Sequence, residues 1–273
     1  MTCPDAFNTS SPAFRRARAW AEVYELIDLQ LSPLGLKAIE ALGLQPGETV
    51  LDIGCGAGET LLQLAERVGA EGQVIGVDVA PLLLEVATRR TEALRRVRLV
   101  EADAQLLDLP SASADAVFSR FGVMAFGDPV AAFANFHRIL KPGGALAFCC
   151  WRSFGENELD RFPLLSSGFE APADDTPFSF ADPEHVRRTL AAAGFGDIAV
   201  QAHDAMVSSG SLDAMTEVLL KVGPLGKIVR ESPELRATAE PRLREALAGL
   251  GDPFRVQLKA SVWIATARAV AAP

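Results

Sequence analysis

Apolar residues recur along this chain with two spacings, and the alternation of the two predicts the order of its elements. Short runs that are apolar almost throughout indicate buried strands, whereas apolar residues three and four positions apart indicate helices. Strands are predicted at 49–53, 73–77, 97–100, 115–119 and 145–151, and helices at 59–68, 81–94 and 129–140. Because apolar strands that alternate with helices are covered on both faces, residues 49–151 predict a parallel sheet.

Weaker patterns flank this region. Residues 14–44 have helical spacing that is interrupted at Pro33. After an irregular stretch at 152–180, we predict a helix at 182–193, a strand at 197–202, mostly helical structure at 212–249 broken at Pro224, Gly226 and Pro233, and a strand at 254–267. The whole chain therefore belongs to the α/β class, with helical additions at both sides of the alternating region.

Composition narrows the possible partners and locations. The formal net charge is -9, which argues against nucleic acid as the main partner, because phosphate binding needs a basic face. The largest basic cluster, Arg89 to Arg98, is interpreted as a solvated surface. No apolar run can span a bilayer and residues 1–14 lack the apolar stretch of a signal peptide, so no membrane insertion and a cytoplasmic location are expected. The oligomeric state stays open.

The four cysteines do not indicate a metal site. Cys3, Cys55, Cys149 and Cys150 lack C-x-x-C spacing and have no paired histidines nearby. Neither zinc nor a disulfide framework is expected, and a reducing compartment fits this usage best.

A glycine run between the first predicted strand and helix carries the most chemistry. Gly54, Gly56 and Gly58 alternate after a buried strand, which lets the backbone approach a nucleotide-like cofactor where a Cβ would collide. The dinucleotide fingerprint G-x-G-x-x-G would need a glycine where Glu59 stands. Asp78, about twenty residues further on, could accept hydrogen bonds from ribose hydroxyls or cap the helix that starts near Pro81.

Five segments in order complete this pattern: Leu51–Gly58, Val77–Asp78, Ala102–Ala104, Leu109–Pro110 with Asp115–Ser119, and Arg138–Gly144. With these segments the chain resembles the class I S-adenosylmethionine-dependent methyltransferases, closest to the ubiquinone/menaquinone-methyltransferase-like small-molecule group. The resemblance implies a Rossmann-like, seven-stranded, mostly parallel sheet with helices on both faces, an antiparallel last strand and a helical cap. It implies these divisions: an N-terminal helical segment covering the active site at 1–45, a cofactor-binding core at 46–204, a helical lid at 205–252, and a final core strand with tail at 253–273.

The resemblance also implies a set of cofactor-binding residues for S-adenosylmethionine and its product S-adenosylhomocysteine. They are Asp52, Gly54, Cys55, Gly56, Gly58, Asp78, Val79, Asp103, Ala104 and Ser119. Asp103 would accept from the adenine amino group beside a donor on Ala104, unless it is only an exposed loop acid. Asp52 would organise the glycine loop and the ammonium end of the cofactor, or it is purely structural.

Three residues are candidates for the reaction itself. Arg120 follows the fourth strand and could orient an anionic substrate group or pair with a nearby acid. His203, after the sixth strand, is the best candidate for a base, which is needed only if the nucleophile arrives protonated. Tyr24, the single tyrosine, lies on the N-terminal helical segment and either reaches the site or packs there. His137 is interpreted as structural.

The predicted function is methyl transfer from S-adenosylmethionine to a small, partly apolar organic molecule by in-line displacement. The apolar residues of 212–228 would wall its pocket or pack the insertion. Two alternatives stay open: an NAD(P)-dependent oxidoreductase, which would share the strand, the glycines and Asp78, and a non-catalytic scaffold that only binds the cofactor.

Overall fold

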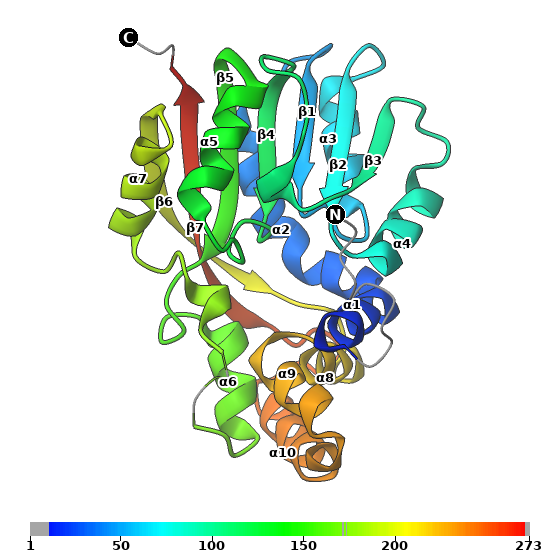
Figure 1. Ribbon diagram of the computed structural model, residues 1–273. Coiled ribbons are helices and arrows are strands. Elements are labelled where there is room, and N and C mark those ends of the chain that lie inside the picture. Colours follow the sequence, from blue (N-terminus) through cyan, green and yellow to red (C-terminus); the bar gives the residue numbers. More distant parts are fainter. Residues whose placement is uncertain (1–10, 171, 173, 271–273) are drawn as a thin grey trace. The chain divides into compact units, whose positions relative to one another are not determined.

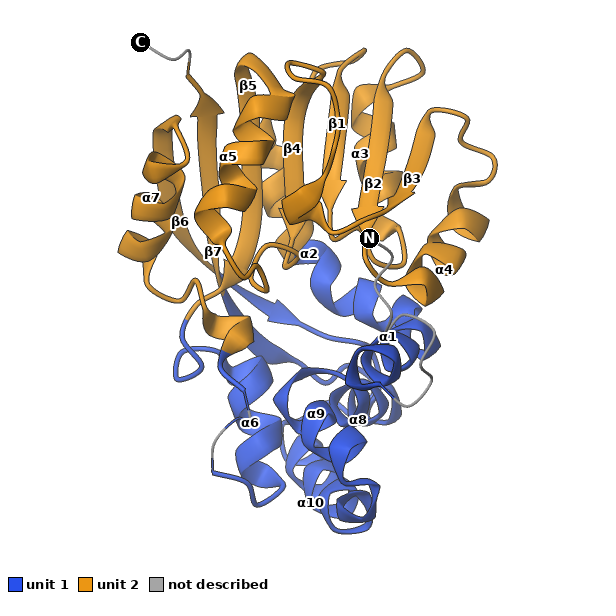
Figure 2. Cartoon of the chain, in the orientation of Figure 1, with its two compact units in different colours: residues 1–33, 153–175, 204–261 blue, residues 34–152, 176–203, 262–273 orange. Residues whose placement is uncertain are grey.

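The computed structural model describes residues 11–170, 172 and 174–270 (Figure 1). Cys3 and the remainder of residues 1–10 lie outside the described residues. The chain divides into two compact units (Figure 2). We call residues 34–152, 176–203 and 262–273 the sheet unit, and residues 1–33, 153–175 and 204–261 the helical unit.

The sheet has the strand order β3-β2-β1-β4-β5-β7-β6. Its strands are β1 (Thr49–Ile53), β2 (Gln73–Asp78), β3 (Val97–Glu101), β4 (Ala114–Arg120), β5 (Leu140–Trp151), β6 (Phe195–Val207) and β7 (Leu258–Ala269). The pairs β1–β2, β2–β3, β1–β4 and β4–β5 are parallel, and β5–β7 is antiparallel. A seven-stranded, mostly parallel sheet with an antiparallel last strand is thus confirmed. The end of β6 after His203 and the start of β7 before Val262 are counted in the helical unit.

Helices cover both faces of the sheet, as Figure 1 shows for α5 and α3. The helices of the sheet unit are α3 (Glu59–Val68), α4 (Pro81–Thr91), α5 (Pro129–Ile139) and α7 (Pro183–Ala192), with the 3-10 turns η1 (Ala104–Leu106) and η2 (Thr176–Phe178) and the second part of α2 (Tyr24–Leu42). Helix α5 starts where the Asp128 side chain accepts a hydrogen bond from the Ala131 amide. It then buries Phe133 against Phe148 of β5, and Phe136 packs on Phe133.

The helical unit is a separate bundle. It contains α1 (Pro12–Glu22), the first part of α2, α6 (Glu158–Ser166), α8 (Leu212–Lys221), α9 (Gly223–Glu231), η3 (Pro233–Leu235) and α10 (Arg236–Ala248). Helix α8 packs on α9 and α10, and α9 also packs on α6 and α1. The apolar residues of 212–228 supply much of this core, because Met215, Val218 and Leu225 are almost fully buried. Their expected second role as a pocket wall stays a prediction.

Some predicted boundaries were wrong for identifiable reasons. The stretch 152–180, expected to be irregular, contains α6, which begins after Asn157. Strand β6 continues to Val207 instead of ending at 202, because its last third alternates polar and partly exposed residues and lacks an apolar signal. The break expected at Pro224 lies at Val222, and Pro224 instead stands in the first turn of α9. Pro33 lies inside α2, and the helical run breaks at Val23.

The two compact units do not follow the predicted divisions residue by residue. The segment 205–252 lies within the helical unit, which also includes 153–175. Helix α2 is divided between the units: its residues up to Pro33 belong to the helical unit and those after it to the sheet unit. The covering roles expected for 1–45 and for 205–252 stay predictions.

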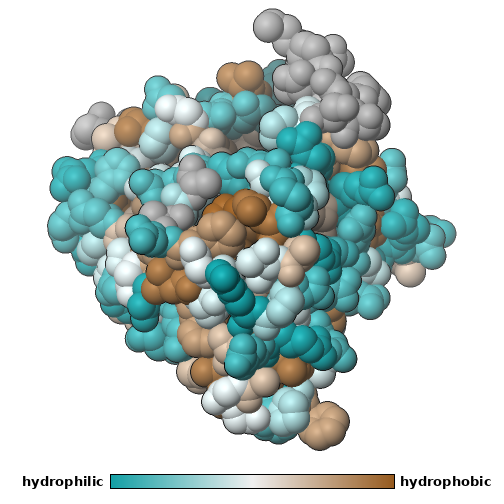
Figure 3. All heavy atoms as spheres, turned by 90° about the horizontal axis from the view of Figure 1, so that it is seen from below, coloured by the Kyte–Doolittle hydropathy of each residue, from teal (hydrophilic) through white to brown (hydrophobic). Residues whose placement is uncertain are grey.

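The surface is mixed in character. On the face shown in Figure 3, hydrophilic side chains predominate and apolar ones form separate patches. Exposed apolar residues come from distant segments, for example Phe254 and Leu106. Within the described part of the chain, no helix is both long enough and apolar enough to cross a membrane.

Candidate functional site

The glycine run forms a tight turn between β1 and α3 that is bonded to the end of β2. The amides of Gly54 and Cys55 both donate to the carbonyl oxygen of Val77, over 2.8 and 3.1 Å. Gly54 has a left-handed φ of 72°, and a Cβ there would lie 2.7 Å from the Cα of Gly122. Gly56 is left-handed as well, but a Cβ there would meet no atom within 4 Å. The turn is therefore packed on one side and open at Gly56.

Asp78 holds this turn from the end of β2. Its Oδ2 accepts a hydrogen bond from the Gly56 amide at 2.8 Å, and its Oδ1 accepts one from the Ala80 amide at 2.9 Å. The N-cap position of α4 is Ala80, so the carboxylate ties the turn together without capping that helix. Both oxygens of Asp78 thus accept backbone donors, and each oxygen of a carboxylate can accept more than one hydrogen bond. Val79, the next residue, exposes 57% of its surface and gives this position an apolar face.

Asp52 is a fully buried carboxylate with one oxygen unsatisfied. Thr60 in the first turn of α3 donates its hydroxyl to Oδ2, while Oδ1 is buried and has no hydrogen-bond partner among the described residues. The pKa of Asp52 is raised to about 7, mainly by burial. The hydrogen bond from Thr60 and the charge of Arg120 oppose this rise, and the charge of Asp78 adds to it. A buried acceptor without a donor is costly, so this atom fits a cationic donor such as an ammonium group. The glycine turn and Asp52 thus fit the cofactor that the sequence predicts.

The end of β4 is fastened to β1 through Ser119. This fully buried hydroxyl donates to the carbonyl oxygen of Ile53 at 2.7 Å and accepts from the amide of Gly122 at 3.0 Å. A Cβ on Gly122 would lie 2.3 Å from the Ile53 oxygen, so the chain passes very close to β1 here. Ser119 therefore positions the crossing between the two strands.

Arg120 pairs with an acid. Its guanidinium forms an ion pair with Glu59, the first residue of α3, and the two side chains keep only 12% and 14% of their surface exposed. The stem of Arg120 lies against Gly35 of α2, where a Cβ would come within 2.8 Å of its Cδ. The pairing with an acid that was expected for Arg120 is thus present, and its other expected role, orienting an anionic substrate group, stays a prediction.

Asp103 and Ala104 form the turn after β3. Asp103 is exposed and caps η1, because its Oδ1 accepts a hydrogen bond from the Gln105 amide at 2.9 Å. Ala104 is buried. The carboxyl ends of β3, β2 and β1 lie next to one another in the sheet. They carry, in this order, the Asp103 turn, Asp78 and the glycine turn.

Two candidates for the reaction remain, His203 and Tyr24. His203 lies inside β6, the outermost strand, three strand positions from β4. At about 4.8 Å per strand this is roughly 14 Å away, which removes the reason for assigning His203 as a base. Tyr24 begins α2 in the helical unit, where its hydroxyl donates to Glu25 at 3.1 Å. His137 of α5 contacts the Val270 carbonyl oxygen at 3.0 Å, in keeping with a structural role.

Four residues of this edge have structural roles that the sequence did not predict. They are Glu59, Thr60, Gly122 and Arg90. Arg90 was interpreted as part of a solvated cluster, which was wrong: its guanidinium donates to the carbonyl oxygen of Ala57 in the glycine turn at 3.0 Å. Thr60 could have been noticed as a hydroxyl in the first turn of the helix after the glycines, within reach of the preceding strand end.

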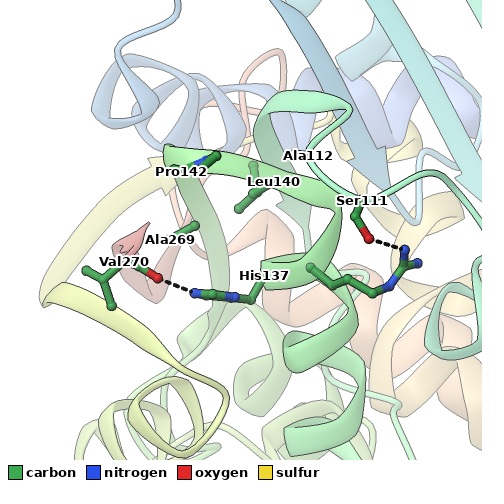
Figure 4. A pocket seen from close by; sticks show the side chains of 8 residues that line it. Ser111, Ala112, His137, Leu140, Pro142, Ala269 and Val270 are labelled. Carbon is green, nitrogen blue, oxygen red and sulfur yellow. Dashed lines mark hydrogen bonds between the residues drawn. The ribbon is translucent and has the colours of Figure 1, made fainter. Parts of the chain in front are cut away.

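A separate pocket of about 240 Å³ lies elsewhere in the sheet unit (Figure 4). It is lined by residues near the start of β5 and the end of β7, including His137, Leu140 and Val270. Ligands of open α/β sheets bind at the carboxyl ends of the parallel strands, and this pocket lies at the start of β5. The site is therefore placed at the glycine turn.

Comparison with known proteins falls on the same segment. Residues 50–144 match the family model described as a methyltransferase domain. The chain is 38% identical over 119 residues to an aklanonic acid methyltransferase from a Streptomyces species, covering 43% of this chain and 54% of that protein. It is 29% identical over 180 residues to a demethylmenaquinone methyltransferase from Staphylococcus epidermidis, covering 60% of this chain and 74% of that one. The chain thus spans between about half and three quarters of these relatives.

The fold has solved counterparts as well. The phosphoethanolamine N-methyltransferase 2 of Haemonchus contortus, solved in complex with S-adenosyl-L-methionine, superposes with a TM-score of 0.58 at 19% identity, over 96% of this chain and 58% of that one. This likeness concerns the fold. Because the family match covers the glycine turn, Asp78 and Asp103, residues 50–144 are a methyltransferase domain, and the chain is similar to S-adenosylmethionine-dependent methyltransferases.

Proposed function

We propose that this protein transfers a methyl group from S-adenosylmethionine to a small, partly apolar organic molecule. The observation that carries the proposal is the buried Oδ1 of Asp52, which has no hydrogen-bond partner among the described residues and stands beside the glycine turn. When bound, the cofactor supplies a methyl group on a sulfonium sulfur, whose departure as a neutral thioether makes displacement easy. The protein therefore has to align the two reactants and exclude water.

The proposed cofactor contacts follow the order of the strands. Asp103 and Ala104 would hold the adenine amino group and ring, with Val79 against the ring. Asp78 would accept hydrogen bonds from the ribose hydroxyls. The backbone from Gly54 through Cys55 and Gly56 to Gly58 would line the methionine side, and Asp52 would accept from its ammonium group.

Arg120 is proposed as a positioning residue. Its pairing with Glu59 at the start of α3 fixes the helix that supplies Thr60, and Thr60 in turn binds Asp52. His203 is not proposed as a base, because β6 lies at the edge of the sheet. Tyr24, which belongs to the helical unit, stays a proposed residue of the active site.

The substrate class is proposed from the family. The names of the two relatives state that one acts on aklanonic acid and the other on demethylmenaquinone. A small organic acceptor that is partly apolar is consistent with both names. The acidic balance of the chain, -9, supports the absence of nucleic acid among its partners. The buried free thiols of Cys55, Cys149 and Cys150 support a cytoplasmic location.

Calorimetry with two cofactors tests the proposal. We expect S-adenosylhomocysteine to bind and NAD not to bind, and Asp52→Asn to weaken the former. Asp160→Asn is the matched control, because Asp160 is also a buried carboxyl but belongs to α6 of the helical unit. Binding of NAD alone would support the oxidoreductase alternative, which none of these similarities favours. S-Adenosylhomocysteine binding without transfer of labelled methyl to any member of a metabolite library would support the scaffold alternative.

A further inference from the structure

We infer that Gln105 is a positioning residue for the cofactor, because its side-chain amide fixes the Asp103 carboxylate in the orientation that selects adenine. The inference rests on the proposed function, in which Asp103 accepts from the adenine amino group. It adds the residue that holds this acceptor in place.

Gln105 lies in η1 and bridges two turns of the sheet unit. Its Nε2 lies 3.2 Å from each carboxylate oxygen of Asp103, and its backbone amide donates to Oδ1 at 2.9 Å. Its Oε1 accepts from the backbone amides of Gly127 and Asp128, at 2.9 and 3.2 Å. Asp128 is the N-cap of α5. One side chain thus joins the turn after β3 to the start of α5.

These partners determine which way round the amide of Gln105 lies. Backbone N–H groups can only donate, so the amide oxygen has to face Gly127 and Asp128. The NH2 group must then face Asp103, whose ionised carboxylate can only accept. The opposite orientation would lose every one of these side-chain hydrogen bonds and would place an oxygen against a carboxylate. The two ends of Gln105 are therefore not interchangeable.

The segment after Gln105 is fastened to α5 as well. Asn135 donates to the Leu107 carbonyl oxygen at 2.9 Å, and Arg138 donates to that of Leu109 at 2.8 Å. The Leu107 side chain is buried in the core of the sheet unit. Gln105 is the link of this series that reaches the carboxylate of the turn after β3. That carboxylate belongs to an exposed residue, which keeps a single orientation only where a partner holds it.

A fixed carboxylate distinguishes adenine from a base of the same shape. The amino group of adenine is a donor that a carboxylate accepts, whereas hypoxanthine carries a carbonyl oxygen at the same position and is repelled. A carboxylate that rotates away loses the attraction to the first base and the repulsion of the second. The ratio of the affinities for S-adenosylhomocysteine and S-inosylhomocysteine therefore reports the orientation of Asp103. A looser fold would weaken both ligands alike and leave this ratio unchanged.

Gln105→Glu is the decisive variant, because it changes only one end of the side chain. The new carboxylate still accepts from Gly127 and Asp128, but it meets Asp103 with an oxygen and repels it. By calorimetry, we expect the parent protein to bind S-adenosylhomocysteine about tenfold more tightly than S-inosylhomocysteine, as expected for one hydrogen bond to a charged group. Gln105→Glu should reduce this ratio to below threefold, mainly by weakening S-adenosylhomocysteine.

Two further variants complete the experiment. Gln73→Glu is the matched control, because Gln73 is the exposed first residue of β2, at the opposite end of that strand from Asp78. It should leave the ratio within twofold of the parent value. Adding Asp103→Asn to Gln105→Glu sets an amide against a carboxylate again, with the donor now at position 103 and its carbonyl oxygen left for adenine. This double variant should return the ratio to at least fivefold.

The outcomes separate this inference from the proposed function. An unchanged ratio in Gln105→Glu, or no recovery in the double variant, overturns the role of Gln105. Equal binding of the two ligands by the parent protein overturns it as well, because Asp103 then does not select adenine. A parent protein that binds neither ligand contradicts the proposed function itself.

Discussion

Gly122 offers the sharpest test of how the site is assembled. A Cβ at this position would lie 2.3 Å from the carbonyl oxygen of Ile53 and 2.9 Å from both the Gly54 Cα and the Ser119 hydroxyl. Ordinary contacts between carbon and a carbonyl oxygen are about 3.3 Å or longer, so Gly122→Ala must separate β4 from β1 by about 1 Å. Neighbouring backbone cannot yield as a flexible side chain can.

The expected cost follows from this displacement. Overpacking of this kind costs about 1–3 kcal/mol of unfolding free energy, which lowers the melting temperature by roughly 2–12 °C in a chain of this size. Because the displaced atoms include the glycine turn, S-adenosylhomocysteine binding should weaken about tenfold, which corresponds to about 1.4 kcal/mol.

Thermal unfolding and calorimetry measure the two effects. Gly155→Ala is the control, because a Cβ there meets no atom within 4 Å and its backbone is not left-handed. If Gly122→Ala matches Gly155→Ala in melting temperature and in affinity, the close crossing of β4 and β1 is not part of the site and the reasoning is refuted.

Four further predictions concern charged groups. Burial raises the pKa of Asp52 from 3.8 to about 7, so the native state holds a proton that the unfolded chain has released, and stability should fall as pH rises from about 4 to about 7. In Asp52→Asn the unfolding free energy, measured by urea unfolding at pH 5 and pH 8, should fall less between these two pH values than in the parent protein. Burial also raises the pKa of Asp160 to about 7, so this carboxyl should likewise make stability fall as pH rises. Replacing it should not change the affinity for the cofactor. Arg120→Met should lower the unfolding free energy by about 3 kcal/mol, because it leaves the mostly buried Glu59 without its cation. Adding Glu59→Gln should recover more than half of this loss. Simple additivity of the two substitutions in the double-mutant cycle would contradict the prediction. Asp78→Ala should weaken S-adenosylhomocysteine binding by about 1–3 kcal/mol, and an unchanged calorimetric affinity would remove Asp78 from the site.

The elements that the sequence predicted well are those with a strong local signal. Strands β1 to β4 lie within a residue or two of their predicted bounds, because buried strands of a parallel sheet must be apolar on both faces. Strand β6 was too short in the prediction, because an edge strand tolerates the polar residues of its last third. Helix α6 was missed since Gly and Pro around it hid its period.

The candidate site divides in the same way. Asp78 and the glycines could be placed from the sequence, because they stand at the carboxyl ends of parallel strands, which share one edge. The partner of Arg120 could not, since Glu59 is 61 residues away and many acids could have served. His203 seemed close to the site only because the edge position of β6 does not follow from the order of strands along the chain.

The sequence by itself determined the α/β order and the glycine turn, because these depend on residues that are near one another in the chain, and its resemblance to a known family indicated the class of cofactor. Only the tertiary structure decided that β4 lies beside β1, although two strands stand between them in sequence. That adjacency buries Asp52 with one oxygen unsatisfied and presses Gly122 against the glycine turn. These features follow from which backbones meet in the folded sheet, and no local pattern of residues encodes that meeting.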